Sequence, residues 1–260
     1  MNGLEAVIAG AIQGTIEWLP ISSEAQTMLY MLNILNIDPQ TALSYAFYLH
    51  FGTMLAVIIK FRNELISIMK SPFPEFKLSA IIIFGSIFTA ITGIPLYIIL
   101  RNVSVGGDSG IFTLIIGLML IITGIVMKHA KHKGHKDIEE INNKDIFLTG
   151  IAQGFAIIPG ISRSGITITT LLIRNVKQET ALTISFLLSV PATMGILLLD
   201  FNALSQIPFQ SMIILTISSL FFGYISMDFL LKFAKNVSFW KFCIIFGLIT
   251  LIFIGIDFFV

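Results

Sequence analysis

Two stretches of the chain place polar and charged residues in patterns that could do chemistry. In the first, Gln13 and Glu17 are four residues apart and therefore share one face of a short helix. The run Pro20-Ile21-Ser22-Ser23-Glu24 follows and adds two hydroxyls and a second carboxylate. Glu17 is a candidate general acid or base and a candidate ligand for a divalent cation. The alternative is a carboxylate that caps a helix or extends to the edge of an apolar layer.

The second stretch is richer in groups that bind anions, and it runs Pro159-Gly160-Ile161-Ser162-Arg163-Ser164-Gly165. Gly160 and Gly165 allow the backbone to approach a ligand closely. Ser162 and Ser164 offer hydroxyl groups, and Arg163 offers a planar fork of five N–H donors. Backbone amides that open a helix after Gly165 add positive potential. Together these groups predict a cradle for a phosphate or pyrophosphate.

For two of the polar residues, a purely structural role stays open. Arg163 could pair with Glu17 as a buried bridge that holds the two stretches together, which does not exclude a binding role. His50 lies within an apolar run beside Phe51-Gly52-Thr53. It could line the same site, or it could be a core histidine that is hydrogen-bonded to its neighbours.

The composition decides which class of protein carries these groups. Of the 260 residues, 55% are hydrophobic and only 12% are charged, and the mean hydropathy is +0.91. Soluble domains carry about a quarter charged residues, so an ordinary soluble enzyme is excluded. The net charge is +1 and the basic residues lie between apolar runs, which gives no nucleic-acid-binding face. The sequence therefore predicts a polytopic membrane protein that lies in the lipid bilayer.

Hydropathy along the chain predicts an all-α fold with six transmembrane helices. A helix needs about 20 mostly apolar residues to cross the hydrocarbon layer. Six stretches are long enough: 41–61, 78–100, 110–128, 180–200, 211–231 and 240–260. Residues 4–35 and 146–173 are also apolar, but each is broken by proline, hydroxyl and charged residues. Because such a break survives only inside protein or beside a water-filled cavity, both are expected to be re-entrant helical hairpins.

The distribution of basic residues predicts the orientation of these helices. With two re-entrant hairpins, 14 of the 16 Lys and Arg residues fall on the cytoplasmic side. The intervening loops, 101–109 and 201–210, hold Arg101 alone, and the sixteenth basic residue is Arg163 in the second break. Both termini are therefore expected outside a cell (plasma) membrane. A homodimer is one possible oligomeric state, and no G-x-x-x-G pattern decides it.

Weak internal similarity predicts that the single integral-membrane domain, 1–260, is a duplication. Thr41-Ala42-Leu43-Ser44 recurs as Thr180-Ala181-Leu182-Thr183, and Gln13-Gly14 recurs as Gln153-Gly154. Repeat 1 would cover about 1–128 and repeat 2 about 146–260, joined by a basic cytoplasmic loop. Because each half has three spans, the second copy must be inverted, so that the two hairpin tips can meet near the midplane. Chance similarity among apolar segments is the alternative.

At the two polar stretches the sequence resembles the undecaprenyl-pyrophosphate phosphatase family of membrane enzymes. Residues 13–23 fit the family's E/Q-x-x-x-E pattern followed by P-x-S-S, and residues 159–165 fit its P-G-x-S-R-S-G signature. Residues 185–192 look like the helix that follows in the family, and His50-Phe51-Gly52-Thr53 looks like its counterpart in the first half. The likeness covers nearly the whole chain, in order.

The resemblance implies hydrolysis of the terminal phosphate of a polyprenyl pyrophosphate, which recycles the lipid carrier of cell-envelope glycan synthesis. It also implies a divalent cation, Mg or Ca. Carried onto this chain, Glu17 would be the acid/base or the carboxylate that holds the metal, and Arg163 would clamp the phosphate. Ser22 or Ser23 would be a nucleophile or a phosphate ligand. The serines of the second signature would support the phosphate oxygens.

Two positions depart from the family pattern. Gln13 occupies the first acidic position, which removes one anionic metal ligand. Where bacterial-type enzymes have T-G-H after the serine pair, this chain has Glu24-Ala25-Gln26. Since glutamine cannot accept a proton as histidine does, Gln26 cannot activate a serine. Either Glu24 is a substitute carboxylate, or a metal-polarised water attacks directly. The alternative function is a transporter or flippase that binds a phosphorylated lipid with the same cradle.

Overall fold

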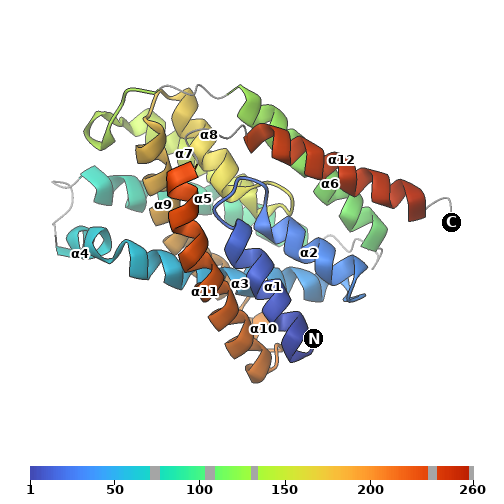
Figure 1. Cartoon of the computed structure of the whole chain (residues 1–260). Helices are drawn as coiled ribbons and strands as arrows, with labels where there is room; N and C mark the ends of the chain where they lie inside the picture. The colour runs from blue at the N-terminus through green and yellow to red at the C-terminus, as the bar shows by residue number, and fades with distance from the viewer. Residues whose placement is uncertain (71–76, 103–108, 130–133, 234–238, 258–260) are drawn as a thin grey trace.

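The computed structural model describes residues 1–70, 77–102, 109–129, 134–233 and 239–257 (Figure 1). Within these ranges the regular elements are helices, and no β-strand forms, so the predicted all-α fold is confirmed. Five of the helices are long and apolar enough to cross a membrane. They are α3 (Pro39–Lys60), α5 (Lys77–Asn102), α6 (Ser109–Lys128), α9 (Gln178–Leu199) and α11 (Phe209–Phe233).

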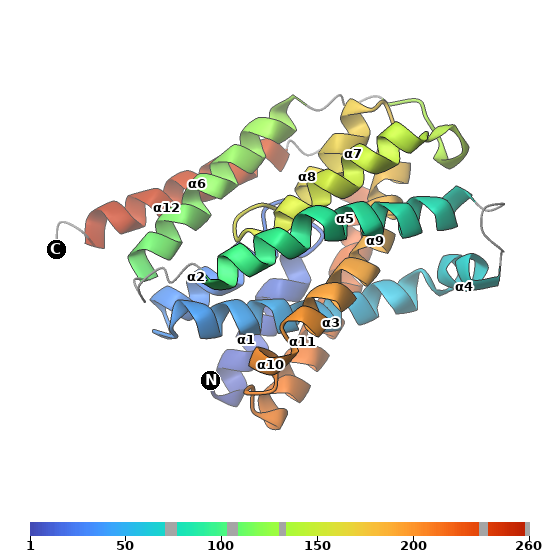
Figure 2. The same ribbon diagram turned by 180° about the vertical axis from the view of Figure 1, so that it is seen from behind.

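The sixth predicted span corresponds to α12 (Phe239–Asp257). Within the residues whose side chains the structure describes, its apolar stretch is Trp240–Ile252, and residues 258–260 of the predicted range lie outside the described residues. The expectation of a sixth crossing therefore stays a prediction. In Figure 2, α12 and α6 lie side by side at one edge of the molecule, where they pack against each other.

The two broken segments form pairs of short helices, as the sequence predicts. The first pair is α1 (Gly3–Ile16) and α2 (Ser23–Asn33), and the second is α7 (Asn143–Gly154) and α8 (Arg163–Ile173). A 3₁₀ turn, η2 (Phe155–Ile157), extends α7 toward its loop. At 14 residues or fewer, each of the four is too short to cross the hydrocarbon layer.

Local sequence explains where the first helix of each pair begins. Asn2 accepts a hydrogen bond from the Glu5 backbone N–H, and the Glu5 carboxylate accepts one from the Asn2 backbone N–H. Asn142 and Asp145 form the same reciprocal capping box at the start of α7. Each box satisfies amides that have no partner within the helix. Shorter helices occupy the predicted loops: α4 (Arg62–Lys70), η1 (Ile138–Glu140) and α10 (Phe201–Leu204).

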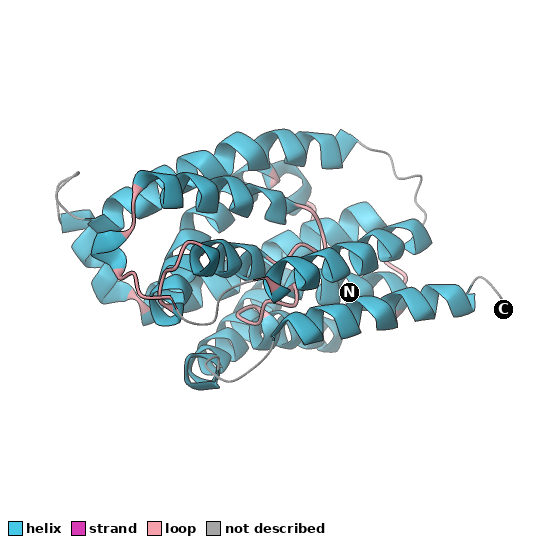
Figure 3. Cartoon of the chain, turned by 90° about the horizontal axis from the view of Figure 1, so that it is seen from above, coloured by secondary structure: helices cyan, strands magenta, loops and turns pink. Residues whose placement is uncertain are grey.

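The first helix of each pair packs on a long helix from the opposite half of the chain. In Figure 1, α1 lies along α11, and in Figure 2, α7 lies along α5. Both crossings are close because glycines lie in them. A Cβ on Gly14 would come within 2.5 Å of the Gly223 nitrogen, and a Cβ on Gly154 within 1.7 Å of Thr92 Oγ1. The view from above in Figure 3 shows loops that lie between the helices in the interior of the molecule.

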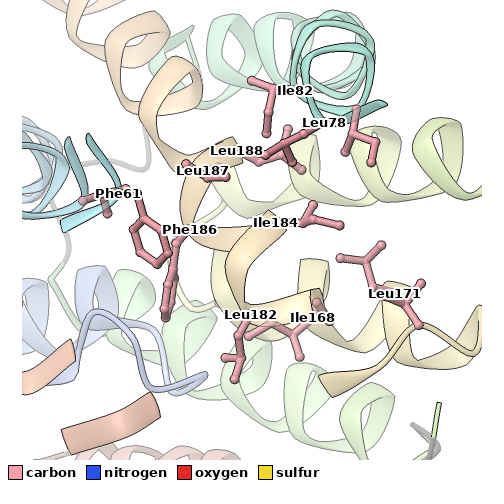
Figure 4. Packing of buried hydrophobic residues seen from close by; sticks show 14 of the residues in the cluster. Phe61, Leu78, Ile82, Ile168, Leu171, Leu182, Ile184, Phe186, Leu187 and Leu188 are labelled. Atoms are coloured by element: carbon pink, nitrogen blue, oxygen red, sulfur yellow. The ribbon is translucent and has the colours of Figure 1, made fainter. Parts of the chain in front are cut away.

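The central helices are α3 and α9, which cross each other and carry much of the core. Figure 4 shows how α9 contributes residues in every direction: Leu182, Ile184, Phe186, Leu187 and Leu188 are all buried. This first half of α9 is buried on nearly all sides, whereas Met194, Leu198 and Leu199 in its second half are exposed. Because α9 is held in this way, the polar groups beside it have a fixed frame.

Candidate active site

The turn between α1 and α2 is forced into an unusual conformation. Pro20 has no N–H to continue a helix, and the Ile21 N–H donates to the Leu19 carbonyl at 2.8 Å. Ser22 then adopts φ 57° and ψ 88°, the left-handed region that non-glycine residues rarely enter. Its hydroxyl accepts a hydrogen bond from the Ala25 N–H at 3.3 Å and so caps α2. Strained backbone of this kind clusters at functional sites.

Trp18 fixes this turn to the rest of the protein. Its indole N–H donates to the Gly223 carbonyl on α11 at 2.8 Å. The ring lies edge-on against Phe186 of α9, with 5.1 Å between the ring centroids. Trp18 is 1% exposed, so Glu17 just before it and the turn just after it are held between α11 and α9.

In the turn between α7 and α8, the residue with positive φ is a glycine instead of a serine. Gly160 has φ 97°, and a Cβ there would lie 2.7 Å from the Ile116 carbonyl oxygen, so only glycine fits. Thr123 of α6 donates to the Gly160 carbonyl at 3.3 Å. Ser162 caps α8 by accepting from the Gly165 N–H at 3.1 Å, which places Arg163 at the first helical position.

The two turns meet at the carboxylate of Glu17, whose side chain is only 3% exposed. Arg163 forms an ion pair with Glu17 Oε1. On the other oxygen, the Ser23 hydroxyl donates at 2.5 Å and the Gln13 amide donates at 2.7 Å. His50 Nε2 lies 3.5 Å from the same oxygen. Glu17 therefore connects a hydroxyl, a guanidinium, an amide and an imidazole.

Arg163 is held from a second direction as well. Its Nη1 donates to the Ser185 carbonyl of α9 at 3.1 Å, and 15% of its side chain remains exposed. Removing one member of a buried ion pair costs about 3–5 kcal/mol because the other charge is left without a partner. The bridge between the hairpins that the sequence allowed is therefore present. Arg163 and Glu17 also border the same cavity, so the bridge does not remove them from a binding role.

A cavity of about 410 Å³ opens beside these groups. The predicted site residues that line it are Glu17, Ser22, Ser23, Glu24, His50, Ser162, Arg163 and Ser164. Its remaining wall comes mainly from α5, from the end of the α7 segment and from the second half of α9. One end of the cavity is therefore charged and polar, and the other end is apolar.

Four predicted site residues lie outside this lining. Gln13 is fully buried and contacts Glu17 from behind. Gly160 packs against α6, and the Gly165 N–H is already bonded to Ser162. Gln26 is on α2, and its buried Nε2 has no partner. The roles that the sequence assigns to these residues stay predictions.

Sequence reasoning missed the polar groups on the wall formed by α5 and α7. Ser86, Thr89 and Gln153 line the cavity, and none was predicted as a site residue. Two signals could have found them. Ser86 and Thr89 are three residues apart in an otherwise apolar span, and Gln153 aligns with Gln13 in the internal similarity.

The groups around Glu24 offer oxygen ligands for a divalent cation. Glu24 Oε1 is buried without a hydrogen-bond partner, and the Glu24 carboxylate is close enough to Glu17 for their charges to interact. Two carboxylates and nearby hydroxyls suit a hard cation that prefers oxygen ligands. Among the described residues, no group of three or more His, Cys, Asp or Glu side chains is placed to hold a metal ion. A cation here would therefore also need ligands from substrate or water.

Sequence comparisons place the chain among known proteins. The profile described as "Bacitracin resistance protein BacA" matches residues 6–252. An undecaprenyl-diphosphatase of Methanothrix thermoacetophila is 47% identical over 253 residues, covering 96% of each chain. An undecaprenyl-diphosphatase of Haloarcula marismortui is 32% identical and covers 94% of each chain. An undecaprenyl-diphosphatase 4 of Bacillus thuringiensis is 38% identical, covering 92% of this chain and 91% of that one. The chain is a multi-pass membrane protein that belongs to the bacitracin resistance protein BacA family.

Proposed function

We propose that the protein is a phosphatase that hydrolyses undecaprenyl pyrophosphate to the monophosphate and inorganic phosphate. The names of its relatives give the substrate class, and one observation about this chain carries the chemistry. A hydroxyl, a carboxylate and a guanidinium from two different hairpins converge at one end of a half-apolar cavity. The polar end suits a pyrophosphate, and the apolar end suits the start of an isoprenoid tail.

Substrate binding begins with an exchange of partners at Arg163. Its guanidinium is paired with Glu17, and a phosphate can take over those donors because phosphate and carboxylate have similar bidentate geometry. The exchange frees the Glu17 oxygen that Arg163 had occupied, while the other carboxylate oxygen stays hydrogen-bonded to Ser23. Arg163 then lies where negative charge develops on the phosphoryl oxygens, which is the main source of catalysis in phosphoryl transfer.

Ser23 is the nucleophile in this proposal. Ser22 uses its hydroxyl to cap α2, whereas the Ser23 hydroxyl donates to Glu17 at 2.5 Å. Ser23 Oγ attacks the terminal phosphorus, its proton passes to Glu17, and the bond from phosphorus to the bridging oxygen breaks. The lipid monophosphate leaves with that oxygen. Water then attacks the phosphoserine, which releases inorganic phosphate and restores the serine hydroxyl with the proton from Glu17.

Glu17 and Glu24 would hold a divalent cation, magnesium or calcium, beside the serine pair. When bound, the cation would neutralise charge on the phosphate oxygens. The support for this ligand pair is the buried Glu24 Oε1, which has no partner within the protein. In this role Glu24 is a metal ligand and leaves the proton of Ser23 to Glu17.

Gln13 and His50 keep the Glu17 carboxylate in position. The His50 Nδ1 lies 2.8 Å from the Ala46 carbonyl, and this contact orients the ring so that Nε2 is directed toward Glu17. Gln13 donates its amide to the same carboxylate oxygen that accepts from Ser23. Their removal is expected to misorient Glu17 and to lower turnover less than removal of Glu17 itself.

We propose that the chain forms one domain, 1–260, of two inverted repeats with six crossings and two re-entrant hairpins. The pairing of α1 with α11 and of α7 with α5 supports this. In each pair, the first hairpin helix of one repeat packs on a long helix of the other repeat, as expected of two equivalent repeats. The bias of Lys and Arg toward one set of loops supports cytoplasmic loops and termini outside the plasma membrane. The cavity would then serve lipid from the outer leaflet.

The test is phosphate release from undecaprenyl pyrophosphate by the detergent-purified protein, with and without Mg or Ca. Glu17→Gln and Arg163→Ala are expected to lower kcat by about 10²–10⁴-fold, the range for loss of an acid/base or a charge-stabilising group. Arg174→Ala is the matched control, because Arg174 caps the far end of the same helix. Chelation of the cation should abolish release, and added cation should restore it.

The same assay separates hydrolysis from carriage of a phosphorylated lipid. A carrier needs the cradle but no nucleophile, and it would bind the lipid through Arg163 without releasing phosphate. The undecaprenyl-diphosphatase names of the relatives do not favour that alternative. Folded wild-type protein that binds the lipid and releases no phosphate would refute the phosphatase.

A further inference from the structure

Helix α5 forms the wall of the cavity opposite Glu17, and its lining residues change from polar to apolar along the helix. Ser86, Thr89, Ala90, Gly93 and Ile94 of α5 all line the cavity. Their spacing of i, i+3, i+4, i+7 and i+8 makes them one continuous stripe. The first two offer hydroxyls and the last three are apolar, so the stripe passes from polar to apolar in the direction of the chain.

The polar end of this stripe is the end nearer Arg163. α5 and α9 run in the same direction: Gly85 lies against Leu188, and farther along, Tyr97 donates to the Leu199 carbonyl. Arg163 is attached to α9 at Ser185, one turn before Leu188. Along the cavity, Arg163 is therefore followed first by the hydroxyl part of the stripe and then by its apolar part.

Gln153 is placed at the boundary between the two parts. Its side chain is buried, lines the cavity, and donates through Nε2 to Thr89 Oγ1 at 3.1 Å. Thr89 itself donates to the carbonyls of Gly85 and Gly150, so it can only accept from Gln153. Gln153 Oε1 has no hydrogen-bond partner. One N–H of the Gln153 amide is thus left to donate to a phosphate oxygen, whereas its carbonyl oxygen can only accept and is left for a water or a protonated phosphate oxygen.

We propose that Gln153 binds the phosphate that remains on the lipid after hydrolysis. This inference rests on the proposed function and adds a residue to its substrate site. The ester-linked phosphate of a pyrophosphate carries one ionisable oxygen and the terminal phosphate carries two. The neutral amide of Gln153 suits the ester-linked phosphate, which carries less charge. The Arg163 guanidinium suits the terminal phosphate, which carries more. The isoprenoid chain then begins where the α5 stripe becomes apolar.

The assay compares wild type with Gln153→Met, which keeps the length of the side chain but removes its amide. The KM for undecaprenyl pyrophosphate should rise by about tenfold, the effect of one hydrogen bond to a charged group, while kcat stays nearly unchanged. Inhibition by undecaprenyl monophosphate should weaken by the same factor. Inhibition by inorganic phosphate should not change, because that product leaves from Arg163.

A matched control is Thr92→Val. Thr92 lies on the same helix and donates to the Ile151 carbonyl of α7, but it does not line the cavity. It should leave KM unchanged, which separates a lost ligand contact from loosened packing between α5 and α7. Gln153→Glu covers the case in which the methionine variant does not fold. Its carboxylate should raise KM further by repelling phosphate.

The possible results are distinguishable from failure of the phosphatase itself. If wild type releases phosphate but Gln153→Met keeps its KM and its monophosphate inhibition, the inference is wrong. A fall in kcat alone, or weaker inhibition by inorganic phosphate alone, would also overturn it. If wild type releases no phosphate, the proposed function fails, and equilibrium binding of undecaprenyl monophosphate to wild type and Gln153→Met then tests the inference directly.

Discussion

The two hairpins share a framework but carry different chemistry. Each begins with a capping box, has a Gln-Gly pair at the end of its first helix, and starts its second helix at a capping serine, Ser22 or Ser162. The first hairpin then contributes the Glu17 carboxylate and the Ser23 hydroxyl, which is not used for capping. The second contributes a guanidinium and, four residues after its glutamine, has the apolar Ile157 where the first has Glu17.

The backbone differs where the chemistry differs. In the first turn Ser22 carries the left-handed conformation, and in the second turn Gly160 carries it. A serine with positive φ is more costly than a glycine, so the first turn stores strain beside the proposed nucleophile. One frame can therefore present complementary groups to a common cavity, with the acid/base on one hairpin and the phosphate clamp on the other.

A very large loss of turnover is expected from Arg163→Lys, which tests whether the second hairpin supplies geometry or merely charge. The guanidinium donates in two directions, to Glu17 and to the Ser185 carbonyl, and an ammonium cannot reproduce that planar fork. Phosphate release should fall by at least about a hundredfold, as for loss of a charge-stabilising donor. Full turnover in Arg163→Lys would mean that the clamp assignment is wrong.

The next effect separates the serines of the first hairpin from each other. Ser23→Ala should abolish nearly all phosphate release, because the Ser23 hydroxyl is the one directed at Glu17. Ser22→Ala should keep most of the turnover and lose about 1 kcal/mol of stability with its helix cap. Single-turnover assays with labelled substrate should trap phosphate on wild type and not on Ser23→Ala. Equal activity of the two variants would contradict the assignment of Ser23.

Much of this site was predictable from the sequence, and the reasons are local. Proline, glycine and hydroxyl residues inside apolar runs identified both turns, and Glu17 and Arg163 were expected to pair or to act together. The choice between Ser22 and Ser23 was not predictable, because it depends on a left-handed residue and on which hydroxyl caps α2. Gln153 and Thr89 were missed because their importance arises only when α5 packs against α7.

A smaller effect on stability probes the glycine contacts that fix each hairpin. At Gly14 an added Cβ meets the backbone of α11, and at Gly154 it meets Thr92 and Gly93 of α5. Gly14→Ala and Gly154→Ala should each lower the free energy of unfolding by about 1–3 kcal/mol, as overpacking does. Gly195→Ala is the control, since a Cβ there meets nothing within 4 Å. Thermal unfolding in detergent measures all three, and an unaffected melting temperature in both variants would refute the close crossings.

The smallest expected effect is a pH-dependent change in melting temperature, and it comes from Asp145 at the start of the second hairpin. Burial acts to raise the pKa of Asp145, but hydrogen bonds from the Asn142 backbone, Arg174 and Lys136 outweigh it and hold the pKa below its ordinary value. A carboxyl whose pKa is lowered by folding stabilises the protein above its unfolded pKa of about 3.9, and this stabilisation is lost as the pH falls through the folded pKa. Asp145→Asn should therefore melt below wild type at pH 7, and the gap should close as the pH falls below about 4. Glu5→Gln, at the equivalent cap of α1, should change the melting temperature less, because Glu5 is only partly buried, whereas Asp145 is fully buried, and within the described residues the Glu5 carboxylate accepts hydrogen bonds from Asn2. A gap between Asp145→Asn and wild type that persists at pH 3 would show that Asp145 acts through its shape rather than its charge.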